Sequence, residues 1–290
     1  TGEFNKKQLN AQLNEIRPAA NGDILVSTEH DGLVVISKTG SIARYTHDPI
    51  YTNSIASDLT RRVISSPEGE VIVGSSAAGI SSFNIYNKTA GYTGIFSDRQ
   101  GNFYDSYMAK IGEDQNGVLW IGAAERVIKW DKKKNLVKFY YYFSEKTGQS
   151  HEVRSLCIDK SGRVWAGTLG NGVSVLSESN GQFKPVSVDT TLGPAFKSNV
   201  ILDLFTASDG MIWVATMAGA YTIDPATLTA NTHKKYPALQ QLTGKRINAF
   251  LEDRDGRIWM ASMNEGVYCY TKKTDQLSHF TKEMGLASGQ

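Results

Sequence analysis

The residues of this chain whose types and spacing could do chemistry first suggest a calcium site. Asp253-Arg-Asp255-Gly256 has the acidic spacing with which a calcium loop begins, and similar segments begin at Asp114 and at Asp159. In an EF-hand register, however, Leu251 would be the first ligand and Ser262 the twelfth, where a bidentate glutamate belongs. We therefore predict hairpin turns in which the aspartate side chains bond to their own backbone.

The histidines, serines and glycines form no pattern of a zinc site, a nucleophile or a phosphate loop. The five histidines have neither zinc spacing nor a cysteine companion, and no Gly-x-Ser-x-Gly elbow occurs. Gly167-Thr-Leu-Gly170-Asn-Gly172 leads into a strand, so it offers no helix N-terminus to a phosphate. The sequence therefore predicts no catalytic residue, no metal site and no cofactor. His30 and His151 stay candidates for ligand contact, because both fall in predicted loops.

The elements that must position these residues repeat along the chain. A turn glycine recurs at intervals of 45 to 48 residues. A bulky apolar residue follows it by three positions, a small residue follows by five, and another apolar residue precedes it by six. The turn glycines are Gly22, Gly69, Gly117, Gly162, Gly210 and Gly256. Four positions in step through six copies indicate six copies of one structural unit.

Four tryptophans occupy the bulky position of this repeat: Trp120, Trp165, Trp213 and Trp259. We interpret them as repeated packing of one sheet against the next. Residues such as Asn21-Gly22 and Asp255-Gly256 tolerate the positive φ of a tight hairpin between the first two strands.

Each repeat reads as four short strands, and a period of about 47 residues is the size of a β-propeller blade. We predict an all-β fold, a β-propeller of four-stranded antiparallel blades, as a single domain over residues 1–290. The ends of the sequence favour a seven-bladed ring completed outside these residues, with a six-bladed ring as the alternative. The six blade repeats are predicted at residues 9–46, 58–97, 106–143, 151–188, 199–234 and 245–283.

Composition excludes several partners. A formal net charge of +2 gives no electrostatic reason to expect nucleic acid or an anionic membrane. Cys157 and Cys269 fall two blades apart, which favours two separate buried thiols over a disulfide. There is no apolar run of about eighteen residues and no signal peptide, so we expect any membrane or export signal to lie outside these residues.

At its repeats the sequence resembles the two-component regulator propeller family, whose pattern is Val-x-x-Ile-x-Glu-Asp-x-x-Gly-x-Leu-Trp-Ile-Gly-Thr-x-x-Gly-Leu. Three stretches follow it closely: residues 108–122, 153–172 and 247–266. The first two copies depart from it, with Leu25 and Ile72 in place of tryptophan, and the third copy lacks the second glycine.

This resemblance implies the extracytoplasmic sensor region of a hybrid two-component histidine kinase, a fragment of a longer multi-domain protein in the periplasm. It implies an oligosaccharide ligand and regulation of polysaccharide-utilisation genes. It also implies an adjacent propeller and an immunoglobulin-like domain of the same chain as partners, and a homodimer of the full sensor. The kinase itself would lie outside this chain, which we expect to be no enzyme.

Candidate ligand residues lie in the loops that share one face of a propeller, which are those joining second to third strands and those leading into first strands. Sugars are recognised by planar hydrogen-bonding groups and by aromatic faces. The best-placed side chains of these kinds are Arg62, Tyr107, Arg126, Arg154 and Asn171.

Two other functions stay open. The first is an enzyme like the streptogramin lyases, which have similar blades, with pieces of a site from His30, Glu125 and His151. The second is a scaffold propeller that binds another protein through the same face.

Overall fold

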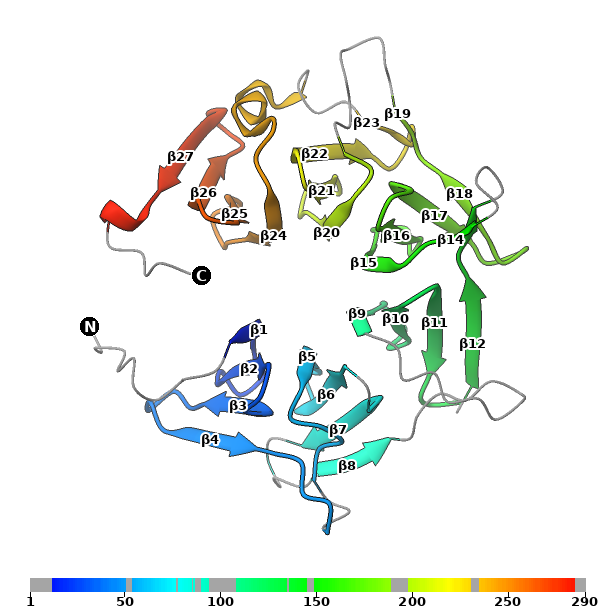
Figure 1. Cartoon of the computed structure of the whole chain (residues 1–290), viewed down its shortest axis with the longest axis vertical. Coiled ribbons are helices and arrows are strands. Elements are labelled where there is room, and N and C mark those ends of the chain that lie inside the picture. The colour runs from blue at the N-terminus through cyan, green and yellow to red at the C-terminus, as the bar shows by residue number, and fades with distance from the viewer. Residues whose placement is uncertain are drawn as a thin grey trace. The chain divides into compact units, whose positions relative to one another are not determined.

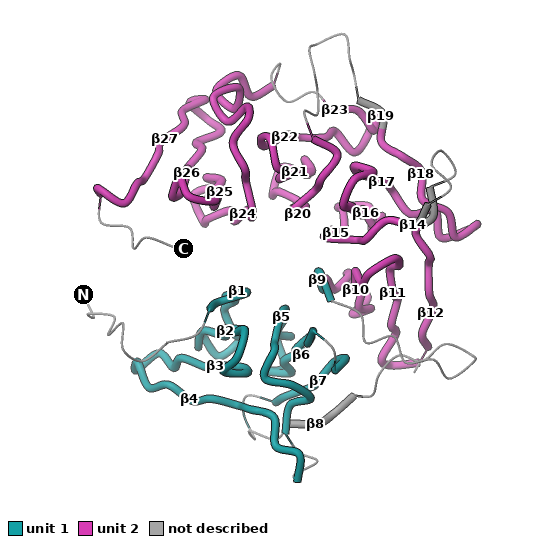
Figure 2. Tube along the Cα trace, viewed as in Figure 1, with its two compact units in different colours: residues 1–111 teal, residues 112–290 magenta. Residues whose placement is uncertain are grey.

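The computed structural model describes residues 12–50, 54–76, 78–84, 86, 90–93, 108–134, 136–144, 149–188, 198–230 and 235–284. The chain divides into two compact units, residues 1–111 (unit 1) and residues 112–290 (unit 2), and the division falls inside one strand (Figure 2).

Unit 1 contains two four-stranded antiparallel sheets, each with its strands in chain order. The first comprises β1 (Leu13–Pro18), β2 (Ile24–Thr28), β3 (Leu33–Ile36) and β4 (Ile42–Tyr45). The second comprises β5 (Thr60–Ser65), β6 (Glu70–Ser75), β7 (Ile80–Asn84) and β8 (Ala90–Thr93).

The third sheet begins with the strand in which the units divide. It comprises β9 (Met108–Glu113), β10 (Leu119–Ala123), β11 (Arg126–Asp131) and β12 (Leu136–Tyr141). A short hairpin follows, of β13 (Phe143–Ser144) and β14 (Gln149–Ser150).

The remaining three sheets lie entirely in unit 2. The fourth comprises β15 (Val153–Ile158), β16 (Val164–Thr168), β17 (Val173–Ser177) and β18 (Gln182–Pro185). The fifth comprises β20 (Ile201–Thr206), β21 (Ile212–Thr216), β22 (Gly219–Asp224) and β23 (Thr229–Ala230), with β19 (Ser187–Val188) parallel to β23. The sixth comprises β24 (Ile247–Glu252), β25 (Ile258–Ser262), β26 (Gly266–Thr271) and β27 (Gln276–Phe280).

The short 3-10 helices η3 (Pro237–Leu242) and η4 (Lys282–Met284) flank the sixth sheet. The predicted all-β propeller fold of four-stranded antiparallel blades is confirmed, although β19, which belongs to the fifth sheet, comes from the range predicted for the fourth blade. We number the blades one to six in chain order. The number of blades in a closed ring and the single domain stay predictions.

The turn between the first and second strands explains the recurring glycine. The backbone of Gly22, Gly162 and Gly256 has φ of 83°, 83° and 75°, a region in which side chains are disfavoured. In each turn the glycine N–H donates to the carbonyl oxygen three residues earlier, as Gly162 does to Asp159 at 2.9 Å. The predicted hairpins and the predicted free, buried cysteines are both confirmed.

The aspartate of this turn orients the tryptophan that follows it by six residues. Asp159 Oδ2 accepts the indole N–H of Trp165 at 2.9 Å, while its Oδ1 accepts the backbone N–H groups of Ser161 at 2.9 Å and Arg163 at 3.0 Å. The indole N–H groups of Trp120 and Trp259 donate to equivalent aspartates at 3.0 and 2.7 Å. The aspartates therefore hydrogen-bond as predicted, to their own turns, and they also fix the indole.

The buried tryptophans at the repeat position of unit 2 pack against the blade that follows. Trp165 is fully buried in a cluster with Leu204, Ile212 and Val214 of blade five. Trp213 is likewise buried against Phe250 and Met260 of blade six. Figure 1 shows the sheets of unit 2 following one another in chain order, with first strands β15, β20 and β24 on the inner side. The predicted packing of sheet on sheet through tryptophan is what these clusters show.

The small residue of the repeat is required by the same contact. A Cβ atom added to Gly167 would lie 2.5 Å from Cγ2 of Ile201 and 3.2 Å from Cγ of Leu204. First-strand side chains of blade five therefore occupy the space that a side chain on blade four would need. Close approach of the two sheets selects glycine here.

Blades five and six depart from the regular pattern. Ala207 replaces the turn aspartate of blade five, and the indole of Trp213 is packed instead by Tyr236, with ring centroids 5.4 Å apart. The hydroxyl of Tyr236 donates to Asp209 at 3.1 Å. In blade six Trp259 is only partly buried, and its indole stacks on Phe280 at 5.6 Å.

We expect Asp159→Ala to lower the free energy of unfolding by about 2 kcal/mol, because it leaves the buried Trp165 N–H without its acceptor. Urea unfolding followed by tryptophan fluorescence measures this loss. Asp253→Ala is the matched control, since the Asp253 side chain is 20% exposed against 2% for Asp159. A loss for Asp253→Ala as large as that for Asp159→Ala would contradict the role of burial.

The same aspartate predicts an acid-sensitive contribution to stability. Burial opposes ionisation of Asp159, but hydrogen bonds from Ser161, Trp165 and Arg163 outweigh it and lower its pKa below the ordinary value. A carboxylate with a depressed pKa stabilises the fold above its unfolded pKa of about 4, and this stability is lost as the pH falls through the folded value. Stability measured from about pH 6 down to about pH 3 should fall less steeply in Asp159→Asn than in the wild type. Parallel slopes would exclude this carboxylate as a source.

Candidate functional site

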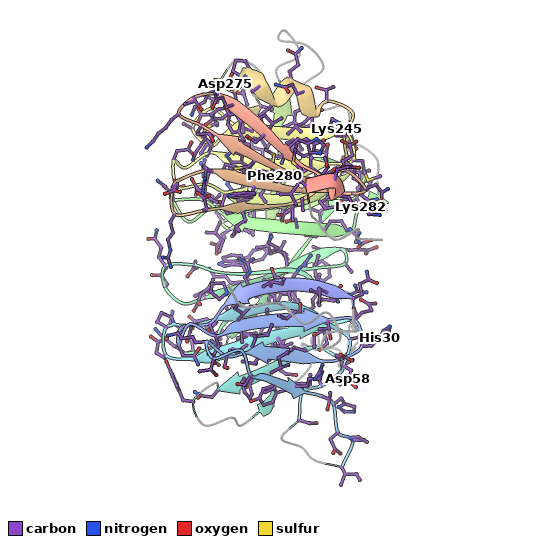
Figure 3. The ribbon with its side chains drawn as sticks, turned by 90° about the vertical axis from the view of Figure 1, so that its left-hand side faces the viewer. His30, Asp58, Lys245, Asp275, Phe280 and Lys282 are labelled. Atoms are coloured by element: carbon purple, nitrogen blue, oxygen red, sulfur yellow. The ribbon has the colours of Figure 1, made fainter. Side chains whose placement is uncertain are left out.

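One end of each sheet carries the loops in which the sequence places the ligand residues. Antiparallel strands bring the loop between second and third strands to the same end as the segment that leads into the first strand. In unit 1 His30 and Asp58 lie at one such end, and in unit 2 Lys245 lies at the opposite end of the sixth sheet from Asp275 (Figure 3). We call this end of the blades the loop face.

Backbone hydrogen bonds hold the loop face of unit 2 together. The N–H of Leu169 donates to the carbonyl of Glu152 at 2.9 Å, and the N–H groups of Gly170 and Gly172 donate to the carbonyl of Asn199 at 3.1 and 3.0 Å. Thus the loop of blade four is bonded both to the residue that precedes its own first strand and to the segment leading into blade five. Similar bonds join the other blades of unit 2. The N–H of Gly244, before blade six, donates to the carbonyl of Ala218 at 2.9 Å, and the N–H of Val153, in blade four, donates to the carbonyl of Ala124 at 2.5 Å.

Asn171 lies in this bonded loop, as predicted. Its backbone N–H donates to Thr168 Oγ1 at 3.1 Å, and its side-chain amide donates to the hydroxyl of Tyr142 at 3.1 Å. The Tyr142 hydroxyl also bonds to Ser174 Oγ at 2.8 Å, and the ring is 2% exposed. The amide of Asn171 is therefore held in one orientation by Tyr142.

Arg154 lies close by at the start of β15. Its guanidinium pairs with Glu152 at 2.9 Å, and the two side chains are 31% and 34% exposed. The bond between Leu169 and Glu152 connects this pair to the loop that carries Asn171. Arg154 and Asn171 are thus the two predicted site residues that the structure brings to one region.

Arg62 is engaged with the backbone of neighbouring first strands. Its Nε donates to the carbonyl of Ala109 in β9, and its Nη1 lies 3.5 Å from the carbonyl of Asn14 in β1. Residues at this repeat position, seven before the turn glycine, tie first strands elsewhere as well. The N–H of Leu204 donates to Ser155 at 2.9 Å, and that of Phe250 donates to Asp203 at 3.2 Å.

The other two predicted residues are Arg126, which is buried, and Tyr107, which the structure does not describe. Arg126 on β11 is 4% exposed, and its guanidinium lies 5.8 and 5.7 Å from the ring centroids of Phe139 and Tyr141. Tyr107 lies outside the described residues.

The structure adds a cluster on blade six that the sequence reveals only in part. The carboxylate of Glu265 accepts hydrogen bonds from Lys245 and, at 2.5 Å, from the hydroxyl of Tyr268. The bond from Lys245, with that from Tyr268, holds the pKa of Glu265 below its ordinary value. The ring of His279 stacks on Tyr268 at 4.1 Å. Tyr268 and His279 face each other across β26 and β27, so a register prediction could have paired them.

Unit 1 has its own polar cluster on the loop face. Arg61 pairs with Glu29 at 2.9 Å and donates to Ser76 Oγ at 2.6 Å. Asn14 donates to Glu29 at 3.1 Å and to the carbonyl of Thr60 at 2.7 Å. All of these hydrogen bonds and ion pairs join residues of unit 1 to one another.

Within the described ranges, no three His, Cys, Asp or Glu side chains gather as metal ligands would. His30 and Glu125, named for the enzyme alternative, are exposed, and His151 is partly buried. No helix in the part of the chain that the structure describes is long and apolar enough to cross a membrane. The loop face thus presents hydrogen-bonding side chains on loops whose backbones are bonded to one another.

Solved structures show where this fold occurs. The extracellular domain of a putative hybrid two-component system from B. thetaiotaomicron superposes with a TM-score of 0.78 at 16% identity, covering 97% of this chain and 36% of that one. Virginiamycin B lyase from Staphylococcus aureus superposes with a TM-score of 0.70 at 14% identity, covering 98% and 89%. At these identities the likeness concerns the fold alone.

Sequence comparisons point to one family. A histidine kinase P4 of Formosa agariphila is 24% identical over 311 residues, which cover 99% of this chain and 21% of the kinase. The chain thus spans about a fifth of that relative and about a third of the solved extracellular domain. Residues 147–170 and 241–264, in blades four and six, match the sequence profile of the two component regulator propeller. The chain is thus a β-propeller, and its blades four and six match repeats of the two-component regulator propeller family.

Proposed function

We propose that this chain is the extracytoplasmic sensor propeller of a hybrid two-component system. The observation that carries the proposal is the family match in blades four and six. The likeness to a histidine kinase along 99% of the chain supports it, as does the fold of the solved extracellular domain. The propeller itself contributes binding, and the kinase chemistry belongs to other parts of the full protein.

The ligand in this proposal is an oligosaccharide that binds at the loop face of blade four. Arg154 offers a guanidinium that can exchange Glu152 for a sugar hydroxyl, and Asn171 offers an amide already oriented by Tyr142. Planar groups held in this way bind hydroxyl pairs with little loss of side-chain entropy. Arg62 and Arg126 are used largely within the fold, and we assign them to its support rather than to contact with the sugar.

Transmission of binding follows from the bonds between blades. A ligand can signal only if it binds two arrangements of the sensor with different affinity. The loop of blade four is bonded to the segment leading into blade five through Asn199, so a shift of this loop is passed to its neighbour. We propose that this displacement alters how the propeller packs against its partner domains.

The surroundings of the full protein belong to the same proposal. We place the chain in the periplasm, beside a second propeller and an immunoglobulin-like domain of one polypeptide that forms a homodimer. Its output would be the regulation of polysaccharide-utilisation genes. The lengths of the two relatives, of which this chain spans 21% and 36%, leave room for such domains.

Calorimetry of this chain and of the complete extracytoplasmic region, against oligosaccharides from plant and host polysaccharides, tests the function. We expect Arg154→Ala and Asn171→Ala each to weaken binding about tenfold, the loss of roughly one charge-assisted or neutral hydrogen bond. Lys273→Ala is the matched control, because this exposed lysine lies in the turn between β26 and β27, at the opposite end of the sheet from the loop face.

The results separate the function from the site. If no oligosaccharide binds, the sugar-sensing proposal is wrong. If a sugar binds and both loop-face variants keep wild-type affinity, the site is wrong. Metal-dependent turnover of a cyclic ester would favour the lyase-like alternative over a sensor.

Arg62→Ala should act on stability rather than on binding. The variant leaves the carbonyls of Ala109 and Asn14 without a charged donor, so we expect a loss of about 2 kcal/mol in the free energy of unfolding. Arg154→Ala removes a partly exposed ion pair and should change it by less than about 1 kcal/mol. Urea unfolding of both variants makes the comparison, and equal losses would remove the distinction.

A further inference from the structure

The loop face of unit 2 carries three exposed apolar side chains at one position of the repeat. Leu169, Met217 and Met263 each follow the turn glycine by seven residues, in blades four, five and six. Their exposed fractions are 42%, 41% and 47%. We call these three residues the apolar strip.

The fold does not require apolar residues at this position. In unit 1 the equivalent residues are Glu29 and Ser76, and both are polar partners of Arg61. A carboxylate and a hydroxyl therefore fit the same backbone. Since burial within the blade does not explain Leu169, Met217 and Met263, their exposure is a property of the surface, where grouped apolar side chains mark contact sites.

The backbone beneath the strip is fixed. Leu169 pairs with Val200 as an antiparallel bridge, and the N–H of Met217 donates to the carbonyl of Val200 at 3.4 Å. Leu169 and Met217 thus lie one strand spacing on either side of Val200, about 10 Å apart. The N–H of Met263 donates to the carbonyl of Arg246 at 3.3 Å. Backbone hydrogen bonds therefore fix the main chain at all three positions of the apolar strip.

Polar side chains beside the apolar strip form ion pairs and hydrogen bonds with one another. Arg154 pairs with Glu152, Lys245 pairs with Glu265, and Arg246 donates to Asn248 at 2.9 Å. An apolar centre with a polar, internally paired margin has the composition of a protein interface.

The chemistry of the strip favours protein over sugar. Sugars stack on aromatic rings and need hydrogen-bonding groups, whereas the strip consists of one leucine and two methionines. Flexible thioether and branched aliphatic side chains adapt to other aliphatic side chains. The solved extracellular domain is about three times as long as the part this chain covers, so further modules are available in such proteins to supply that surface.

We infer that the apolar strip is the docking surface for an aliphatic patch on another module of the same full-length protein. This inference rests on the proposed sensor function and names one of its internal contacts. A module docked on the apolar strip would lie beside Arg154 and Asn171, because Leu169 shares a loop with Asn171. A ligand bound at that loop would therefore directly affect the docking contact between the apolar strip and the other module.

Hydroxyl-radical footprinting with mass spectrometry tests the inference. The modification rates of Leu169, Met217 and Met263 are compared between this 290-residue chain and the complete extracytoplasmic region. We expect about tenfold slower modification in the complete region, corresponding to a docked population of about nine-tenths. Leu136 on β12, 61% exposed, is the control that should react equally in both.

A triple variant, Leu169→Glu with Met217→Glu and Met263→Glu, should abolish the protection, read at Val200 and Lys245 beside the strip. Glu29 shows that the fold accepts a carboxylate at this position. A second triple variant carries serine at the same three positions, because Ser76 shows that the fold accepts serine there. This variant checks that the lost protection reports lost docking and not misfolding. Unchanged melting temperatures of both variants in the 290-residue chain establish that the blades are intact.

The outcomes separate the possible occupants of the strip. Equal reactivity of the strip in both proteins overturns the inference. Protection that appears only with bound oligosaccharide assigns the strip to the ligand site and overturns it while supporting the sensor function. Protection that rises with concentration of the 290-residue chain identifies a second copy as the occupant and also overturns it. Protection without any sugar binding supports the docking contact and contradicts sugar sensing.

Discussion

The contact on which the structure depends is the burial of one blade's second strand beneath the first strand of the next. In unit 2 this contact places Trp165 under Leu204 and brings Ile201 so close to Gly167 that no side chain fits there. A blade cannot bury this surface alone, because a single four-stranded sheet has two faces to cover. The order of the blades and the spacing of their loops follow from it.

Hydrogen bonding to the tryptophan is secondary to that burial. Three turns supply an aspartate to the indole, whereas blade five has Ala207, and the buried indole N–H of Trp213 has no acceptor among the described residues. An unpaired buried donor costs about 1 to 3 kcal/mol. Full burial of a large aromatic side chain contributes a similar or larger amount. Packing on Tyr236 therefore suffices to keep Trp213 in the repeat position.

Sequence reasoning predicted what the repeat itself encodes. The turn glycines, the tryptophan packing and the four strands of each blade could be predicted because the same contact recurs in step. The site could be predicted less well. The sequence places Arg62 near a loop, and the structure adds that a polar residue seven before the glycine ties first strands together, as Ser155 and Asp203 do. That role depends on which neighbour a side chain reaches, and a single sequence does not contain this distance.

A repeat fold also explains why the ligand is difficult to predict. Positions that the packing fixes look alike in every copy, whereas the loop-face positions vary, and one of them holds glutamate, serine, alanine, leucine or methionine in different blades. Any specificity must therefore come from residues that depart from the repeat. In the proposed site Asn171 illustrates this, because its orientation comes from Tyr142, which the short β13–β14 hairpin follows directly. The irregular segments of the blades, rather than their regular strands, are where a binding site can differ from one propeller to another.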